Sequence, residues 1–354
     1  MLRTPRPPAL LALCACAAAM LGGCQDSFEI AVGPNQDVEI FSDLPPGDER
    51  VALVGELLER KVETPVRPES LFRVTLADPG SFRSMRDYRN LVVVGDLRGT
   101  GWAADLCREV IGSDGRESLV AAGTGYVFTR DVWARGQTLL FVHAPEVEAL
   151  RRHLAERGAA LLEQLGERVI EGLRETLYLP SGEQSAMAAG IAQRHGYTLR
   201  IPGDYLVDED RESRFVRLKR IQPGEPVGFL FVYYEPRRLD LDDPRLPTLC
   251  IALRDTLARR YFGGDWVEPS RTTARATTFL GRPALELYGL YQNDAPMGGP
   301  FRMYAFHEGE RLYLIDLAVF NPPGRKLPFM RQLEAIARTF RTEGERLLPP
   351  PPGR

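Results

Sequence analysis

Histidine is scarce in this sequence, and the most recognisable catalytic motifs are missing. The four histidines are scattered singly along 354 residues, so they offer no cluster that would hold a metal ion. There is no G-x-S-x-G nucleophile turn, and no phosphate-binding glycine loop followed by Lys-Ser or Lys-Thr. The glycine-rich turn at residues 95–102 lacks that lysine, and we interpret it as a plain strand-to-helix turn instead of a nucleotide site. We therefore expect no metal and no cofactor, and we assign no catalytic residue.

Cysteine is also rare beyond the first 24 residues, where only Cys107 and Cys250 occur. Each falls on the apolar face of an expected helix, and the two lie in different expected domains. Because an unpaired cysteine behaves as a small buried hydrophobe, we interpret both as inert core thiols. A disulfide between them remains the alternative, since an exported chain can carry one.

Long apolar runs are confined to the start of the chain. Arg3 and Arg6 precede an apolar stretch at residues 9–23, which has the length of a signal-peptide core and is too short for a membrane span of about 20 residues. Leu21-Gly22-Gly23-Cys24 then has the form of a bacterial lipobox. We predict a lipoprotein signal peptide at residues 1–23 and lipidation of Cys24, which would anchor the protein in a bacterial membrane, facing the periplasm or the cell surface. An ordinary secretory signal is the alternative.

The remaining chain has no excess of positive charge. Loss of Arg3 and Arg6 takes the formal net charge from −3 to −5, which argues against a nucleic-acid partner. No later segment approaches the length of a membrane span. Residues 24–36 are expected to form a tether, and the proline-rich residues 344–354 a tail.

The periodicity of apolar residues predicts an α+β protein with two domains. Residues 37–180 mix strand and helix patterns and end in a helix of some 30 residues that opens at Pro145, so an α/β domain is expected there. Residues 181–343 carry strand patterns joined by polar turns, which predicts a largely antiparallel sheet covered by helices. The sequence "HEGER" has the composition of a hairpin turn, with Gly309 at the tight position.

Two acidic runs are candidates for calcium binding, but neither has an established ligand spacing. They lie at residues 207–212 and 240–243, and we expect both to be solvated loops.

The segment "NDAPMGGPFRMY" is the most unusual one in the second half of the chain. Glycine alone enters positive φ freely, so Met297-Gly298-Gly299-Pro300 permits a backbone path closed to other residues. We consider two interpretations: a loop that lines a groove or an interface, and an irregular turn that enters a strand. Arg254 and Asp255 lie off the apolar stripe of their helix, so they either form a structural ion pair or face a site.

These segments resemble a known family. "APMGGPFRMYAF", "VFNPPGRKLPFMRQLEAIARTF" and Arg254-Asp255 are similar to signatures of bacterial lipoproteins with the uncharacterised domain of unknown function 4837. The resemblance extends over nearly all of the mature chain, although "YGLYQND" replaces the family's tryptophan-containing pattern. It assigns no activity. By residue it falls on the following positions: Arg254, Asp255, Met297, Gly298, Gly299, Pro300, Phe301, Pro323, Lys326 and Glu334.

We therefore predict a lipid-anchored envelope protein that works by binding or scaffolding, with an envelope protein or a cell-wall component as its partner. The candidate binding residues are Arg254, Asp255, Met297, Gly298, Gly299, Pro300 and Phe301. The alternative is an envelope hydrolase or another enzyme with an unrecognised polar site, because scattered carboxylates leave no motif. A deep polar pocket around these residues would favour the enzyme.

Overall fold

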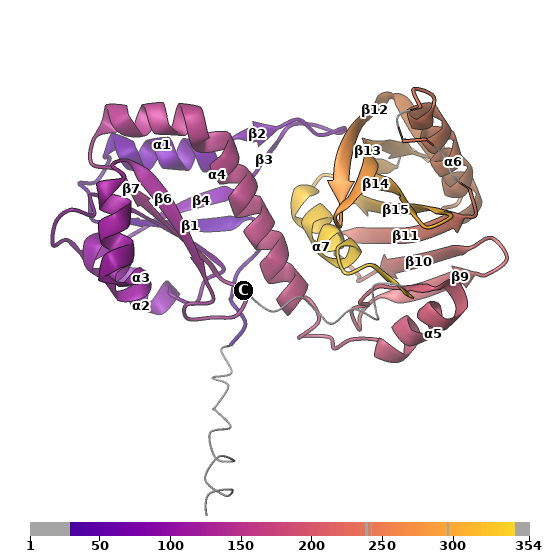
Figure 1. Ribbon diagram of the computed structural model, residues 1–354, viewed down its shortest axis with the longest axis horizontal. Helices are drawn as coiled ribbons and strands as arrows, with labels where there is room; N and C mark the ends of the chain where they lie inside the picture. The colour runs from indigo at the N-terminus through magenta and orange to yellow at the C-terminus, as the bar shows by residue number, and fades with distance from the viewer. Residues whose placement is uncertain (1–28, 238–239, 242, 296, 344–354) are drawn as a thin grey trace, which may run out of the picture.

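The structure is a computed structural model that describes residues 29–237, 240–241, 243–295 and 297–343. The predicted signal peptide, Cys24 and the proline-rich tail lie outside these residues. Within them, no helix combines the length and the apolar character needed to cross a membrane. The α+β prediction is confirmed, and Figure 1 shows two sheets side by side, each covered by helices.

The N-terminal sheet is mostly parallel. Its strand order is β4-β1-β5-β7-β6, and only β6 runs antiparallel to its neighbour. Because β5 and β7 are buried on both faces, their sequences are continuous apolar runs instead of alternating ones. The strands are β1 (Asp37–Ser42), β4 (Arg73–Ala77), β5 (Asn90–Gly95), β6 (Gly125–Arg130) and β7 (Thr138–His143).

Helices cover both faces of this sheet. On one face lie α1 (Glu49–Leu58) and the 30-residue α4 (Val147–Thr176). On the other lie α2 (Phe82–Met85), which follows the short 3-10 turn η1 (Pro79–Ser81), and α3 (Trp102–Ala121), which is interrupted at Gly112.

The expected tether is shorter than predicted. Ile30 and Val32 form isolated bridges with Arg135 and Tyr88, and Ala31 and Asn35 are buried. Residues 30–35 therefore belong to the folded N-terminal domain, because their backbone groups find partners there.

The C-terminal sheet has seven strands, and every neighbouring pair in it is antiparallel. The order is β12-β13-β14-β15-β11-β10-β9, and β14 and β15 meet in the expected hairpin with Gly309 at φ 58°. The strands are β9 (Leu206–Asp210), β10 (Phe215–Arg220), β11 (Val227–Glu235), β12 (Trp266–Phe279), β13 (Arg282–Gln292), β14 (Gly298–Glu308) and β15 (Arg311–Phe320).

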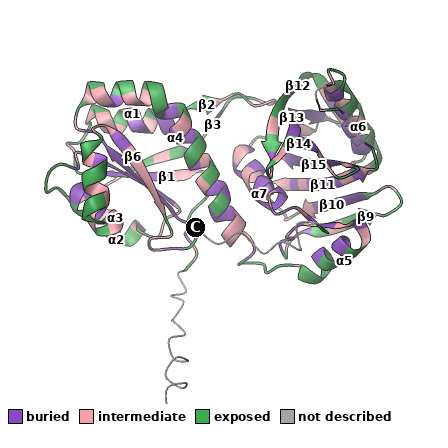
Figure 2. Ribbon diagram, viewed as in Figure 1, coloured by how far each residue is buried: buried purple, intermediate pink, exposed green. Residues whose placement is uncertain are grey.

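The two faces of this sheet are covered by different helices. The helix α6 (Leu246–Tyr261) packs on one face, whereas α5 (Ser185–His195) and α7 (Leu327–Ala337) pack on the other. A short pair, β8 (Tyr197–Thr198) and β16 (Arg341–Thr342), closes the second face. Figure 2 shows buried residues concentrated on the sheets and on the inner sides of the helices.

Two sequence interpretations can be compared directly with this fold. The acidic run at residues 207–212 is not a solvated loop, because its first four residues belong to β9, where Asp208 pairs with Arg217 and Glu209 with Arg194. The interpretation of Cys107 and Cys250 is confirmed. Both thiols are free and buried, and burial raises the pKa of Cys107 to about 11 and that of Cys250 to about 12.

The two sheets are joined by α4, α7 and a small hairpin that the sequence did not predict. Figure 1 shows α4 and α7 side by side between the sheets, and Ala335 of α7 is part of the N-terminal core. The hairpin strands are β2 (Lys61–Val62) and β3 (Glu69–Ser70). The carboxylate of Glu69 accepts hydrogen bonds from the backbone N–H groups of Lys326 and Leu327, so the N-terminal domain caps a helix of the C-terminal one.

Candidate functional site

Arg254 is buried inside the C-terminal domain. Its guanidinium lies 2.6 Å from a carboxylate oxygen of Asp316 on β15, and only 4% and 2% of these two side chains are exposed. The same guanidinium stacks on the ring of Phe301 at 3.5 Å from the ring centre. The structure therefore brings Arg254 and Phe301 together. Arg254 forms a structural ion pair with Asp316 and at the same time stacks on the ring of Phe301.

Asp255, the next residue, points to a different place. It forms an ion pair with Arg259 one helical turn on, and it accepts a hydrogen bond from the backbone N–H of Val267 at 2.8 Å. These contacts fix the start of β12 against the end of α6. Asp255 thus does not join Arg254 in a common site.

The glycines of the candidate loop are part of β14, and neither has a positive φ. A Cβ on Gly298 would lie 2.3 Å from the carbonyl oxygen of Tyr291, and one on Gly299 would lie 1.9 Å from that of Val319. Glycine is therefore required because neighbouring strands approach closely. Met297, at the entrance of the strand, is exposed, whereas Pro300 and Phe301 are buried. The interpretation as an entry into a strand fits this geometry better than a groove-lining loop.

The space next to Arg254 is too small for a substrate. A cavity of about 10 Å³ lies between Arg254, Asp265, Tyr291 and Asp316, which is about the volume that one water molecule needs. Burial raises the pKa of Asp316 against the opposing effect of Arg254, as expected for a pair held away from solvent. These residues do not surround a deep polar pocket.

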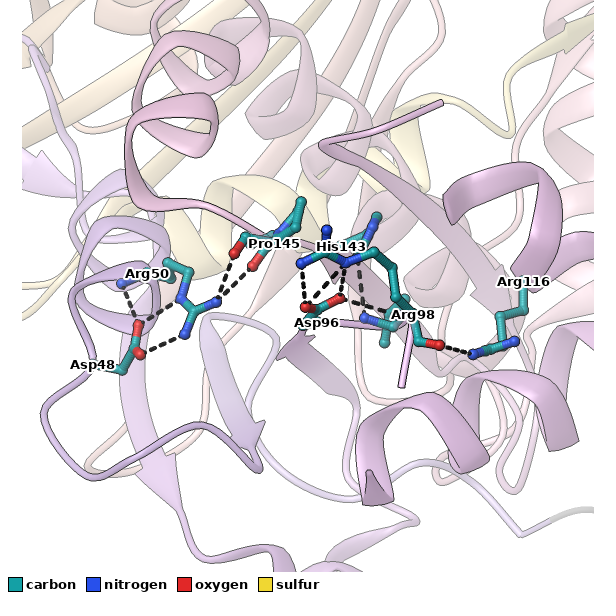
Figure 3. Close-up of polar contacts among 9 residues, drawn as sticks. Asp48, Arg50, Asp96, Arg98, Arg116, His143 and Pro145 are labelled. Carbon is teal, nitrogen blue, oxygen red and sulfur yellow. Dashed lines mark hydrogen bonds and ion pairs between the residues drawn. The ribbon is translucent and has the colours of Figure 1, made fainter. Parts of the chain in front are cut away.

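The N-terminal sheet has the topology that places ligand sites at its carboxyl edge. The connection after β1 runs through α1 on one face and the connection after the adjacent β5 runs through α3 on the other, so the chain reverses between these strands. In open α/β sheets, ligands bind in the crevice at such a point. Figure 3 shows the polar residues that gather there.

Each charged group in this cluster is used to brace the loops. Arg50 forms an ion pair with Asp48 and donates hydrogen bonds to the carbonyl oxygens of Ala144 and Pro145 (Figure 3). Asp96 pairs with Arg98 at 2.7 Å. These arginines lower the pKa of Asp48 and of Asp96 through hydrogen bonding, so both carboxylates stay ionised and are poor general bases.

Two further contacts close the crevice. The carboxylate of Asp43 accepts a hydrogen bond from the backbone N–H of Ala103 and so occupies the start of α3, where a phosphate would bind in a nucleotide fold. His143 is fully buried, and its Nδ1 accepts a hydrogen bond from the backbone N–H of Leu97. Burial lowers the pKa of His143, so it is neutral and holds β7 against the loop after β5. The turn at residues 95–102 is therefore a braced strand-to-helix turn.

A site with room for a ligand lies where the two domains meet. A cavity of about 330 Å³, which we call the junction cavity, opens between α4, α7, the β2–β3 hairpin and the strands β13 and β14. Ligand sites commonly form between domains and combine apolar walls with a few polar groups. Its apolar wall consists of Val62, Leu71, Leu162, Ile170, Leu327 and Met330.

The polar wall of the junction cavity includes Glu167, Arg302 and Glu334, which belong to a row of alternating charges that crosses from β12 to α4. Glu286 lies between Arg275 at 2.6 Å and Arg302 at 3.1 Å. Glu334 accepts hydrogen bonds from Tyr304 at 3.0 Å and from Arg338 at 2.8 Å. Glu286 and Glu334 are buried, and Tyr304 together with these two carboxylates raises the pKa of Arg302 against the opposing effect of burial.

The row continues into the N-terminal domain, because Arg338 also pairs with Glu167 on α4. The side chain of Arg302 is 30% exposed, and Arg302 and Tyr288 both line the cavity. The burial of Tyr288 raises the pKa of its phenol to about 12, so that it is a neutral hydrogen-bond donor. Glu63 and Glu163 stand at the rim, and neither has an ion-pair partner among the described residues.

Sequence reasoning found only one member of this cavity, Glu334, and that through the family resemblance. Glu286 and Arg302 sit at polar positions of alternating strands, which in isolation indicate a solvent-facing side. The available signal was the charge pattern itself: a glutamate inside the apolar helix α7, four residues before an arginine. Nothing in the chain indicated that this face lies against a second domain.

Comparison with known protein families gives a match for the C-terminal domain. Residues 183–339 match the model of a family described as a domain of unknown function (DUF4837). The expected resemblance is confirmed over this range, which is narrower than predicted because the N-terminal domain lies outside the match. No curated protein matches the chain.

Several solved structures are weakly similar. A protein from Bacteroides thetaiotaomicron VPI-5482 has 9% identity over 42% of this chain and 45% of its own, with a TM-score of 0.27. Cyanobacterial PsbP (CyanoP) from Synechocystis sp. PCC 6803 has 13% identity over 42% and 88%, with a TM-score of 0.31. LpqN, involved in cell envelope biogenesis of Mycobacterium tuberculosis, has 13% identity over 41% and 81%, with a TM-score of 0.27. Scores this low carry no conclusion about function.

Proposed function

We propose that this chain is a lipid-anchored protein of the bacterial cell envelope that works by binding a small molecule in the junction cavity. In this proposal Cys24 carries the lipid, and the folded body faces the periplasm or the cell surface. The ligand is then a component of the envelope or of the cell wall.

The observation that carries the proposal is the junction cavity itself. It is large enough for a small organic molecule, it has an apolar wall and a polar wall, and it lies between two domains that share α7. Of the carboxylates that line it, Glu167 and Glu334 are both paired with Arg338, which suits recognition and not proton transfer. The alternative of an envelope enzyme has less support, because Asp48 and Asp96 at the N-terminal crevice are also paired with arginines.

The binding part of the proposal can be tested by filling the cavity. Gly166 of α4 lines it, and a Cβ there meets no atom within 4 Å. Leucine in place of Gly166 should occupy the apolar wall without strain. We expect the neutral dye N-phenyl-1-naphthylamine to bind the wild-type protein with increased fluorescence, and the Gly166→Leu variant to bind it several-fold more weakly.

Ala159→Leu is the matched control, because Ala159 is an exposed residue of the same helix that does not line the cavity. Equal dye binding by wild type and Gly166→Leu would overturn the proposed site. The anchor is tested separately by intact mass measurement of membrane-extracted wild type and Cys24→Ser. An unmodified chain that still begins at Met1 would overturn the lipid attachment.

A further inference from the structure

A second pocket lies on the other side of β3 from the apolar wall of the junction cavity. It has a volume of about 390 Å³, and its lining includes Glu59, Lys61, Arg67, Glu69, Phe72, Arg73 and Arg325. In the β2–β3 hairpin, Lys61 pairs with Ser70 in register, which fixes Lys61 on this side. We call this space the basic pocket.

The positive groups of the basic pocket exceed its carboxylates. Arg73 is neutralised by Asp37, whereas Lys61, Arg67 and Arg325 have no carboxylate partner among the described residues. Arg67 and Arg325 instead donate to backbone carbonyl oxygens, of Pro323 and Ser70 respectively. These contacts hold the two guanidinium groups in place without cancelling their charge.

The carboxylates that line this pocket are already engaged. Glu69 uses its oxygens to accept hydrogen bonds from the backbone N–H groups of Lys326 and Leu327. Glu59 accepts one from the backbone N–H of Val74. The start of α7 is thus capped by Glu69, so an incoming anion would be bound by side chains and not by the helix terminus.

Residues next to the basic pocket have pKa values that reflect the same excess of positive charge. Lys326 is 95% buried, since only 5% of it is exposed, and its ammonium has no hydrogen-bond partner among the described residues. Burial and the charge of Arg67 lower the pKa of Lys326. Arg331 lines the junction cavity and its guanidinium lies over the ring of Phe72, and burial and the charge of Arg325 likewise lower its pKa to about 10. Cations that disfavour one another in this way are stabilised by a bound anion.

We propose that the basic pocket binds the phosphate group of an anionic ligand, with Lys61, Arg67 and Arg325 as its direct contacts. A phosphate monoester carries a charge of about −1.5 to −2 at pH 7 and three acceptor oxygens, which matches several converging cations better than a single carboxylate does. This site is separate from the junction cavity, so it stands or falls independently of the small-molecule binding proposed above.

The small number of lysines offers a direct test. The chain contains three, Lys61, Lys219 and Lys326, and Lys219 lies far from the pocket on β10, over the ring of Phe229. We would follow reductive methylation of Lys61 in the full chain by peptide mass spectrometry, with Lys219 as the internal control. Phenyl phosphate is the probe, benzoate is the carboxylate comparison, and detergent micelles with or without phosphatidic acid, a lipid with a phosphate monoester, distinguish a lipid headgroup from a soluble phosphate.

We expect phenyl phosphate to slow methylation of Lys61 several-fold while leaving Lys219 unchanged, and benzoate to do so less. Arg67→Gln should weaken this protection on the order of tenfold, because it removes a charge-assisted contact. Arg83→Gln, an exposed arginine outside the pocket, should leave it unchanged. Protection by phosphatidic acid alone would assign the phosphate to a lipid. Equal effects on Lys61 and Lys219, no effect of either phosphate, or equal protection by benzoate would overturn the proposal.

Discussion

The two faces of the C-terminal sheet both bury arginine against carboxylate, and they do so in different ways. On the α6 face, Arg254 and Asp316 form a single pair with space for about one water molecule beside them. On the α7 face, Glu286, Arg302 and Glu334 belong to a longer row that borders the junction cavity. The first arrangement only holds the domain together, whereas the second leaves polar groups next to a space that a ligand can enter.

The stability of the protein should therefore depend most strongly on the charges of the Arg254–Asp316 pair. Asp316→Asn would leave the guanidinium of Arg254 buried without a counter-charge, and breaking a buried pair costs about 3–5 kcal/mol of unfolding free energy. Urea unfolding at pH 7 measures this cost. Asp105→Asn, in an exposed pair with Arg108, is the control and should change stability by less than about 1 kcal/mol.

The double variant Arg254→Met/Asp316→Leu tests the reason for that cost. If the penalty comes from an unpaired charge, removing both partners should recover most of the lost stability, since apolar replacements of buried pairs are often neutral. A double variant as unstable as Asp316→Asn would mean that the pair itself, and not the orphaned arginine, supplies the stability.

The row of Glu286, Arg302 and Glu334 should tolerate the loss of one charge better than the Arg254–Asp316 pair does. Glu334→Gln keeps a hydrogen-bond acceptor for Tyr304, and its arginine neighbours retain Glu286 and Glu167. Because the junction cavity lets solvent approach, we expect a cost of about 1–3 kcal/mol in the same urea experiment. A cost equal to that of Asp316→Asn would remove the distinction between the two faces.

A third charged cluster lies on the side of the sheet that α5 and α7 cover. Its contribution to stability should depend on pH. Glu209 on β9 accepts hydrogen bonds from Arg194 and His195, and these lower its pKa from an ordinary value of 4.5 to about 2. A depressed carboxylate pKa stabilises the folded state above pH 4.5, and this contribution is lost as the pH falls from about 4.5 to about 2. Glu209→Gln should thus be less stable than wild type by about 1–2 kcal/mol at pH 7.

The stability gap between wild type and Glu209→Gln should narrow at pH 3, measured by urea unfolding at both pH values. Glu163→Gln changes an exposed glutamate without an ion-pair partner among the described residues, so it should show no such change. A gap for Glu209→Gln that stays constant between pH 7 and pH 3 would contradict a depressed pKa.

These clusters mark the limit of what the sequence predicts. Apolar periodicity predicted α4, the central strands β5 and β7, and the β14–β15 hairpin, because each of these depends on neighbours within one element or one turn. The partner of Arg254 could not be predicted, since Asp316 is 62 residues away and looks like a polar interruption of an apolar strand.

The glycine pair shows the same limit in a different form. Gly298 and Gly299 are unusual in the sequence, but the sequence does not distinguish the two reasons for a glycine there, because close strand packing and a positive φ select the same residue. The junction cavity was missed for a related reason. Its walls come from both domains, and only the docking of α7 on α4 brings Glu334 near Glu167.

The smallest expected effect on stability comes from two glycines of α4, one of which has free space beside it while the other is tightly packed. Gly166 of α4 faces the junction cavity, where a Cβ meets nothing within 4 Å, whereas a Cβ on Gly172 would lie 2.7 Å from the carbonyl oxygen of Gly136. Replacing a helical glycine by alanine gains about 1 kcal/mol where there is room. Gly166→Ala should therefore raise the urea midpoint slightly, and Gly172→Ala should lower it because the backbone of Gly136 has to move. A lower urea midpoint for Gly166→Ala than for wild type would mean that α4 has no free space at Gly166, and the junction cavity would then be closed in solution.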